Sequence, residues 1–70
     1  MIREPVASTN IVSLGYDADT ETLEVEFGSG SVYQYYNVGA AIYEQLAEAS
    51  SKGQFINTYI KNAYPFSRVG

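Results

Sequence analysis

Hydrophobic and polar positions change their spacing once along the chain. Over residues 10–36 apolar side chains recur at about every second position, whereas from Val38 onward they recur at every third or fourth. The first spacing is typical of strands with one face in a core, and the second is typical of amphipathic helices. The sequence therefore predicts an α+β domain in which a sheet half precedes a helical half.

The sheet half contains three predicted strands, at residues 11–16, 22–27 and 31–36. The polar segment 17–21 supplies the turn between the first two. Alternation along the first strand predicts that the following side chains share one face: Val12, Leu14 and Tyr16.

The second predicted strand alternates without a fault. Leu23, Val25 and Phe27 point to one face, while Glu24 and Glu26 point to the other. We expect Phe27 to be a core side chain. The two glutamates are interpreted as ionised groups on a solvated face, because nothing nearby in the sequence buries them or separates their pKa values.

The loop after this strand decides where two tyrosines point. A three-residue loop with Gly30 at positive φ pairs Val25 with Tyr33 and Leu23 with Tyr35, so both rings face the core. A two-residue loop shifts the register by one and turns both rings outward. The position of Gly30 favours the three-residue loop.

The first predicted helix begins at about residue 38, with Asn37 as a plausible cap. Its apolar stripe consists of Val38, Ile42, Leu46 and Ala49.

The second predicted helix begins after Ser51. Ser51 and Gln54 have the spacing of a capping box, in which each side chain satisfies a free amide of the other. Pro65 is expected to end this helix near Ala63 or Tyr64, because proline disfavours the helical conformation in the residue before it.

Together these elements predict one domain spanning residues 1–70, with an irregular arm at 1–9, a core at 10–66 and a short tail at 66–70. The architecture is a three-stranded antiparallel meander followed by two helices packed on one face. The first and third strands, or one of them paired with the arm, remain edges. An exposed edge invites pairing with a second chain or a peptide, so a protein partner or a homodimer is expected there.

This order of residues resembles the KTSC domain family over nearly the whole chain, from about Pro5 to Val69. The residues that carry the resemblance are Ser8-x-Asn10-Ile11, Gly15-Tyr16-Asp17, Leu23-x-Val25-x-Phe27, Gly30, Tyr33-x-Tyr35, Val38, Tyr43, Ala49-x-x-Lys52-Gly53-x-Phe55-x-Asn57 and Ile60. The family is found at the C-terminus of some lysyl-tRNA synthetases and alone in short bacterial and phage proteins, and it has no established biochemical activity. Its presence on a synthetase implies contact with RNA by association only. One departure is Gly39, where the family pattern has proline, which loosens the start of the first helix.

The composition excludes several kinds of chemistry. The chain has no Cys and no His, so thiol nucleophiles, thiolate metal sites and the usual general base near neutral pH are all missing. No phosphate loop or dinucleotide fingerprint occurs. We therefore expect neither an enzyme nor a cofactor. The apolar run of a secretory signal or membrane span is also lacking, which predicts a cytoplasmic protein.

One acidic cluster partly matches the spacing of a calcium-binding loop. Asp17, Asp19 and Glu21 alternate as at the opening of a calcium loop, but Thr22 stands where that loop needs Gly and Gly28 where it needs Glu. The cluster is interpreted as a polar turn, and no metal site is predicted.

Two groups of residues are candidates for binding. Tyr33, Tyr35 and Tyr36 form a possible stacking surface, with the rim of the core as the competing interpretation. The second group would form an anion-binding corner, with helix capping, packing and turn formation as the competing roles. Its members are Ser50, Lys52, Gly53, Asn57, Lys61 and Arg68.

The sequence predicts a non-catalytic interaction module that binds a protein partner or itself. An RNA-binding accessory module related to tRNA is the alternative. The charge opposes that alternative, since eight acidic residues face four basic ones and the net charge is −4. Clustering of the basic residues beside outward tyrosines would favour RNA, and scattering would oppose it.

Overall fold

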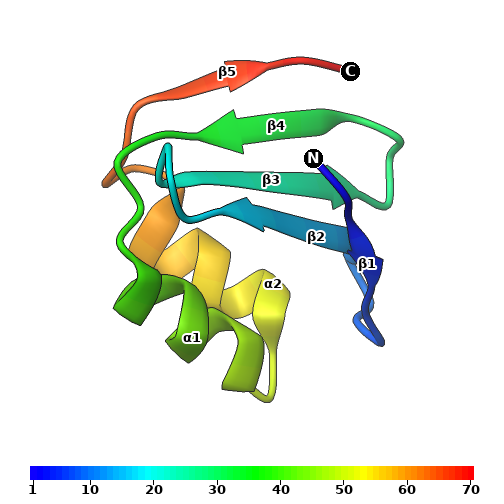
Figure 1. Ribbon diagram of the computed structural model, residues 1–70. Coiled ribbons are helices and arrows are strands. Elements are labelled where there is room, and N and C mark those ends of the chain that lie inside the picture. The colour runs from blue at the N-terminus through cyan, green and yellow to red at the C-terminus, as the bar shows by residue number, and fades with distance from the viewer.

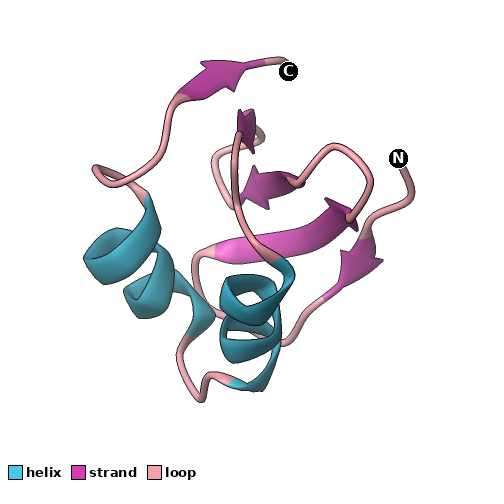
Figure 2. Cartoon of the chain, turned by 60° about the vertical axis from the view of Figure 1, so that its left-hand side comes forward, coloured by secondary structure: helices cyan, strands magenta, loops and turns pink.

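The computed structural model describes all 70 residues as one sheet with a helical segment on one of its faces (Figures 1 and 2). The sheet is antiparallel and its strands follow chain order, with the helical segment inserted between β4 and β5. The elements are β1 (Glu4–Pro5), β2 (Ile11–Asp17), β3 (Thr22–Phe27), β4 (Val32–Tyr35), α1 (Ala40–Glu48), α2 (Lys52–Phe55), η1 (Ile56–Ile60) and β5 (Phe66–Arg68).

The α+β class is confirmed, but the prediction of three strands is wrong, because the sheet has five. Both additional strands lie at edges. In the N-terminal arm, Glu4 pairs with Leu14, and in the tail, Phe66 pairs with Tyr35. These strands contain two and three residues, too few for an alternating pattern to reveal them.

The register of the β3–β4 hairpin follows the three-residue loop. Val25 lies opposite Tyr33 and Leu23 opposite Tyr35, as predicted. Gly30 has φ of 94°, a conformation that favours glycine, and its amide donates to the carbonyl of Phe27. The two tyrosines therefore lie on the face covered by the helices, which we call the inner face.

A β-bulge at the start of β2 changes the predicted face of one residue. Ile11 pairs with Phe27 and Ser13 with Glu26, so Val12 is an extra residue without a partner across the ladder. Val12 consequently points away from the core and is 45% exposed, while Ile11 is buried. The prediction that Val12 shares the core face of Leu14 and Tyr16 is therefore wrong.

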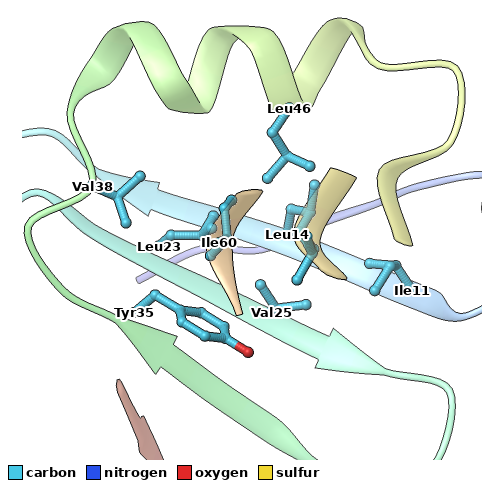
Figure 3. Close-up of a cluster of buried hydrophobic side chains, with 9 residues drawn as sticks. Ile11, Leu14, Leu23, Val25, Tyr35, Val38, Leu46 and Ile60 are labelled. Atoms are coloured by element: carbon cyan, nitrogen blue, oxygen red, sulfur yellow. The ribbon is translucent and has the colours of Figure 1, made fainter. Parts of the chain in front are cut away.

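The core lies between the inner face and the helices (Figure 3). Leu46 points from α1 toward Leu14 and Ile60, and the ring of Tyr35 lies against the inner face. The buried hydrophobic residues are Ile11, Leu14, Leu23, Val25, Tyr35, Val38, Leu46, Ile56 and Ile60. Phe27 is only partly buried at the margin of this cluster, which corrects its assignment to the core.

The start of α1 differs from the prediction. Asn37 does not cap the helix; it has φ of 64° and turns the chain after β4. Gly39 is the N-cap, without a side-chain hydrogen bond. The apolar stripe is placed as predicted, with Leu46 buried and Ile42 and Ala49 half-buried.

The second helical segment begins as predicted and ends earlier. The hydroxyl of Ser51 accepts a hydrogen bond from the amide of Gln54 at 3.3 Å, which confirms the cap. The α-helix α2 then widens into the π-helical turn η1, where the amide of Lys61 donates to the carbonyl of Ile56. Regular helix stops at Ile60 rather than at Ala63 or Tyr64. None of the helices is long and apolar enough to cross a membrane.

The opposite face of the sheet, called the outer face, is not the solvated surface that the sequence predicted. Arg3 crosses it from the N-terminal arm and contacts Ser13, Glu24 and Glu26. Glu24 is only 8% exposed, so its interpretation as an exposed charge is wrong. Its pKa is held below the ordinary value, first by a hydrogen bond from Gln34 and also by Arg3, while burial acts in the opposite direction.

Candidate binding site

A hollow on the inner face lies between η1 and strands β3, β4 and β5. Its cavity volume is about 330 Å³. In Figures 1 and 2 the ribbon of β5 lies apart from α1 and α2. We call this cavity the aromatic hollow. Its lining residues are Phe27, Ser29, Ser31, Tyr33, Tyr35, Asn57, Lys61 and Phe66.

The apolar wall of the aromatic hollow is a continuous group of rings. Tyr33 is central: its ring centroid lies 5.7 Å from that of Phe27, edge to face, and 6.4 Å from that of Tyr35. Phe66 closes the group, with ring centroids 5.8 Å from Tyr33 and 5.9 Å from Tyr35. Such rings offer flat apolar surface with little conformational freedom to lose on binding.

The polar rim of the aromatic hollow carries a cation and no acid. Asn57 and Lys61 come from η1 and its end, and Ser29 and Ser31 come from the β3–β4 loop. Lys61 forms no ion pair, since the ion pairs of the chain all involve Arg3 on the outer face. The aromatic hollow is therefore locally positive, although the net charge of the chain is −4.

A second cation lies on the same face beside the aromatic hollow. Arg68 pairs with Tyr33 across the β4–β5 ladder, and paired residues of antiparallel strands point to the same face. Its Nε donates to the carbonyl of Gly70 at 2.9 Å. Neither ion pair of the chain involves this guanidinium.

The tyrosine hydroxyls of the aromatic hollow are available as donors. Tyr16 and Tyr36 donate to groups within the chain, whereas no internal partner binds the hydroxyl of Tyr33 or Tyr35. Burial, followed by the proximity of Tyr33, raises the pKa of Tyr35 above its ordinary value. Its hydroxyl therefore remains protonated at neutral pH.

The structure brings together one part of the predicted binding residues. Tyr33, Tyr35, Asn57 and Lys61 line the aromatic hollow, and Arg68 lies beside it. Asn57 has no hydrogen bond to a turn, the local role considered for it, and its side chain is exposed. Side chains from both predicted groups thus share one cavity.

The remaining predicted residues lie elsewhere. Tyr36 is on the outer face, where its hydroxyl donates to Gln34. Lys52 donates to the carbonyl of Ala49 at 3.1 Å, and Ser50 and Gly53 border a second, polar hollow formed with residues 7–10. The predicted anion-binding corner is consequently divided. One part lies at the start of the second helical segment, and the other part lies near its end and on β5.

Sequence reasoning missed four residues of the aromatic hollow. The sequence predicts Phe27 as a core residue and Phe66 as part of the tail, because a three-residue strand carries no periodic signal. Ser29 and Ser31 were assigned only to the hairpin loop. A signal for Phe27 and the two serines was present, since the loop that turns Tyr33 inward also brings the end of β3 beside it.

This arrangement favours binding of a flat or bulky apolar group that carries a negative charge. The rings supply the apolar surface, and Lys61 and Arg68 supply the cations. The basic residues are clustered only in part. Lys61 and Arg68 lie at the aromatic hollow, whereas Arg3 and Lys52 lie away from it.

The KTSC domain family model matches residues 7–64. The structure superimposes on the crystal structure of a KTSC domain protein from Yersinia pestis with a TM-score of 0.95 and 36% sequence identity, covering 99% of this chain and 97% of that one. The likeness therefore extends to both edge strands, which lie outside the residues matched by the family model.

Curated relatives fall into two kinds. A lysine-tRNA ligase of Nostoc punctiforme is 42% identical over 59 residues, which cover 84% of this chain and 10% of the ligase. An uncharacterised protein of Stutzerimonas stutzeri is 41% identical over 61 residues, which cover 87% of this chain and 86% of that protein. The chain thus spans about a tenth of the ligases that it matches and most of the short relative.

Proposed function

The chain belongs to the KTSC domain family, and on that premise we propose that it is a non-catalytic interaction module that binds a protein partner, or a second copy of itself, through the aromatic hollow and the adjoining edge of β5. The family has members within lysine-tRNA ligases and members that are short proteins. A module shared by such different proteins is better explained by recognition than by a reaction of its own.

One observation carries this proposal: the aromatic hollow adjoins an open sheet edge. Phe66 belongs to β5 and also forms part of the wall of the hollow. A bound segment can therefore pair with the edge and place a side chain against the rings at the same time. Main-chain pairing supplies affinity in this kind of recognition, and the pocket supplies specificity.

A second candidate is an RNA-binding accessory module, supported by Lys61 and Arg68 beside exposed aromatic surface. Unpaired bases stack on such rings, and cations contact phosphates. The relation to lysine-tRNA ligases supports the same candidate. The net charge of −4 opposes it, because two cations supply few phosphate contacts.

The test combines selection with mapping. Peptides selected from a random phage-displayed library on the immobilised protein are titrated into isotope-labelled protein, and amide shifts are recorded by NMR. A tRNA pool and short single-stranded RNA are titrated separately at about 50 and 200 mM salt. We expect peptide-induced shifts at Ser31, Tyr33, Asn57 and Lys61. Shifts of the same amides by RNA that disappear at the higher salt would promote the second candidate.

Matched variants show whether the aromatic hollow is responsible. Lys61→Gln removes one positive charge at the hollow, and Ala41→Glu adds one negative charge at an exposed position of α1. The first variant should weaken peptide binding and the second should leave it unchanged. Failure to select peptides, together with the absence of RNA-induced shifts, would contradict the proposal for an interaction module.

A further inference from the structure

Resting on the proposed function, we propose that the partner of the aromatic hollow is an extended peptide that adds to β5 as a sixth strand. The peptide carries a large apolar side chain two residues away from a carboxylate. The apolar side chain packs on Phe66 at the open side of the hollow, and the carboxylate meets Arg68.

The side of β5 that faces away from β4 has unpaired main-chain groups. Gln34 pairs with Ser67, and the amide of Tyr36 binds the carbonyl of Pro65. In an antiparallel ladder, alternate residues direct their amide and carbonyl groups toward the partner strand. Phe66 and Arg68 therefore direct theirs away from β4, where an added strand would bind them.

The other edge of the sheet is less suited to an added strand. There, β1 contains only two residues, and Pro5 has no amide to donate. Its neighbour Arg3 is held across the outer face by Glu24 and Glu26. Short edges that contain proline are a common protection against pairing. The edge of β5 has neither proline nor an acidic side chain among its three residues.

The faces of the β5 side chains determine the spacing within the peptide. Phe66 and Arg68 pair with Tyr35 and Tyr33 and so lie on the inner face, whereas Ser67 points to the outer face. Side chains of an added strand that face the same way are also two residues apart. One of them meets the ring of Phe66, which is 55% exposed, and the other meets Arg68.

The charges at this edge complement an acidic side chain. Arg68 and Lys61 form no ion pair with an acidic side chain, and no acidic residue lines the aromatic hollow. A carboxylate on the peptide would provide that partner. A second copy pairing through the same edge would place Phe66, Ser67 and Arg68 opposite β5, and none of these side chains is acidic. The acidic peptide is therefore favoured over self-pairing.

The experiment uses two capped, threonine-rich synthetic peptides. One has glutamate two residues before phenylalanine and the other has the reverse order, because the added strand can be antiparallel or parallel to β5. Binding to the full chain is measured by amide shifts and by the anisotropy of labelled peptide. We expect one of the two orders to bind, with shifts at Phe66, Arg68 and Tyr33. Changing its glutamate to glutamine should weaken binding about threefold.

Two controls separate strand addition from simple stickiness. Methylation of peptide nitrogens that face β5 should abolish binding, since it removes the main-chain hydrogen bonds while keeping the side chains. Arg68→Glu should weaken binding of the glutamate peptide about tenfold and restore binding when the peptide carries lysine instead. The double variant Ala40→Glu with Ala41→Glu makes the same charge change in the first turn of α1, where acids are tolerated, and should bind like the wild type.

Several results would overturn this inference. Undiminished binding of the methylated peptide, or no gain of the lysine peptide with Arg68→Glu, would each exclude it. Binding of neither peptide order would do so as well. If selected peptides of another pattern then shift the amides of the aromatic hollow, or if sedimentation shows a dimer through β5, the proposed function survives without the inference. If RNA alone shifts those amides, both fail.

Discussion

Gly15 shows how one residue without a side chain organises the outer face. A Cβ atom at this position would lie 2.9 Å from the main-chain oxygen of Ile2 and 3.0 Å from Cγ of Arg3. The N-terminal arm therefore crosses β2 at a distance that only glycine allows. This close passage is what brings Arg3 to Glu24 and Glu26.

Gly15→Ala is expected to displace the arm, because the main-chain oxygen of Ile2 cannot move away as a flexible side chain could. We expect a loss of about 1 to 3 kcal/mol of stability, as is usual when extra volume is forced into a packed place. Urea denaturation gives the stability, and the side-chain Nε signal of Arg3 in NMR reports its contacts. An unchanged Arg3 signal would contradict this account of Gly15.

Glu24 is predicted to make stability depend on pH. Its pKa is lower in the folded chain than in the unfolded one, chiefly because Gln34, and then Arg3, donate to its carboxylate. The unfolded chain therefore binds the proton more readily. The resulting stabilisation is complete above the unfolded pKa and is lost as pH falls from about 5 through the folded pKa.

The variant Glu24→Gln isolates this contribution. At pH 7 it should be less stable than the wild type by about 1 to 3 kcal/mol, since it leaves Arg3 without its closest anion in a half-buried place. That difference should shrink as the wild-type carboxylate becomes protonated below its folded pKa. Urea denaturation at a series of pH values from neutral to acid measures it. A difference that stays constant with pH would exclude Glu24 as its source.

At the residue scale, the candidate site was predictable where a local rule fixed the geometry. The position of Gly30 predicted that Tyr33 and Tyr35 point inward, as they do. Asn57 and Lys61 were predicted as part of one anion-binding corner, and the structure places both at the aromatic hollow instead. The role of Phe66 could not be predicted, because it depends on a return of the tail to β4. The burial of Glu24 could not be predicted either, because it depends on the return of the N-terminal arm, with Arg3, across the outer face.

At the scale of elements, periodicity predicted the long strands and α1, and the errors occurred where an element departs from its regular geometry. The bulge at Val12 reverses the faces at the start of β2, and the wide turn of η1 ends the second helical segment early. An amphipathic pattern in one segment contains no sign of either.

The hydrogen bond that caps α2 is predicted to stabilise the second helical segment. Ser51→Ala should cost about 1 kcal/mol, because the amide of Gln54 loses its acceptor. The melting temperature should fall by about 4 to 8 °C for a domain of this size. Ser50→Ala, at an exposed neighbouring residue that accepts no such bond, is the matched control. Equal melting temperatures of the two variants would show that the cap contributes no stability.

At the scale of the whole molecule, the hydrophobic core and the edge strands come from different parts of the chain. The nine buried core residues all lie between Ile11 and Ile60, within the segment 7–64 that the family model matches. The strands β1 and β5 lie outside that segment and contribute no buried hydrophobic residue. The core thus determines the fold, and the two ends of the chain determine what each edge offers to other molecules.

Deletion of residues 1–5 tests whether the core folds without the edge strand β1. The core should remain folded, but Glu24 loses Arg3, and β2 becomes an open edge without the protection of Pro5. We expect a lower melting temperature together with self-association at high protein concentration, because an unprotected edge pairs with other strands. Sedimentation velocity and amide shifts at several concentrations measure both effects. A monomeric deletion variant with wild-type stability would show that the arm neither stabilises the outer face nor protects its edge, and a variant that does not fold would show that the core depends on the arm.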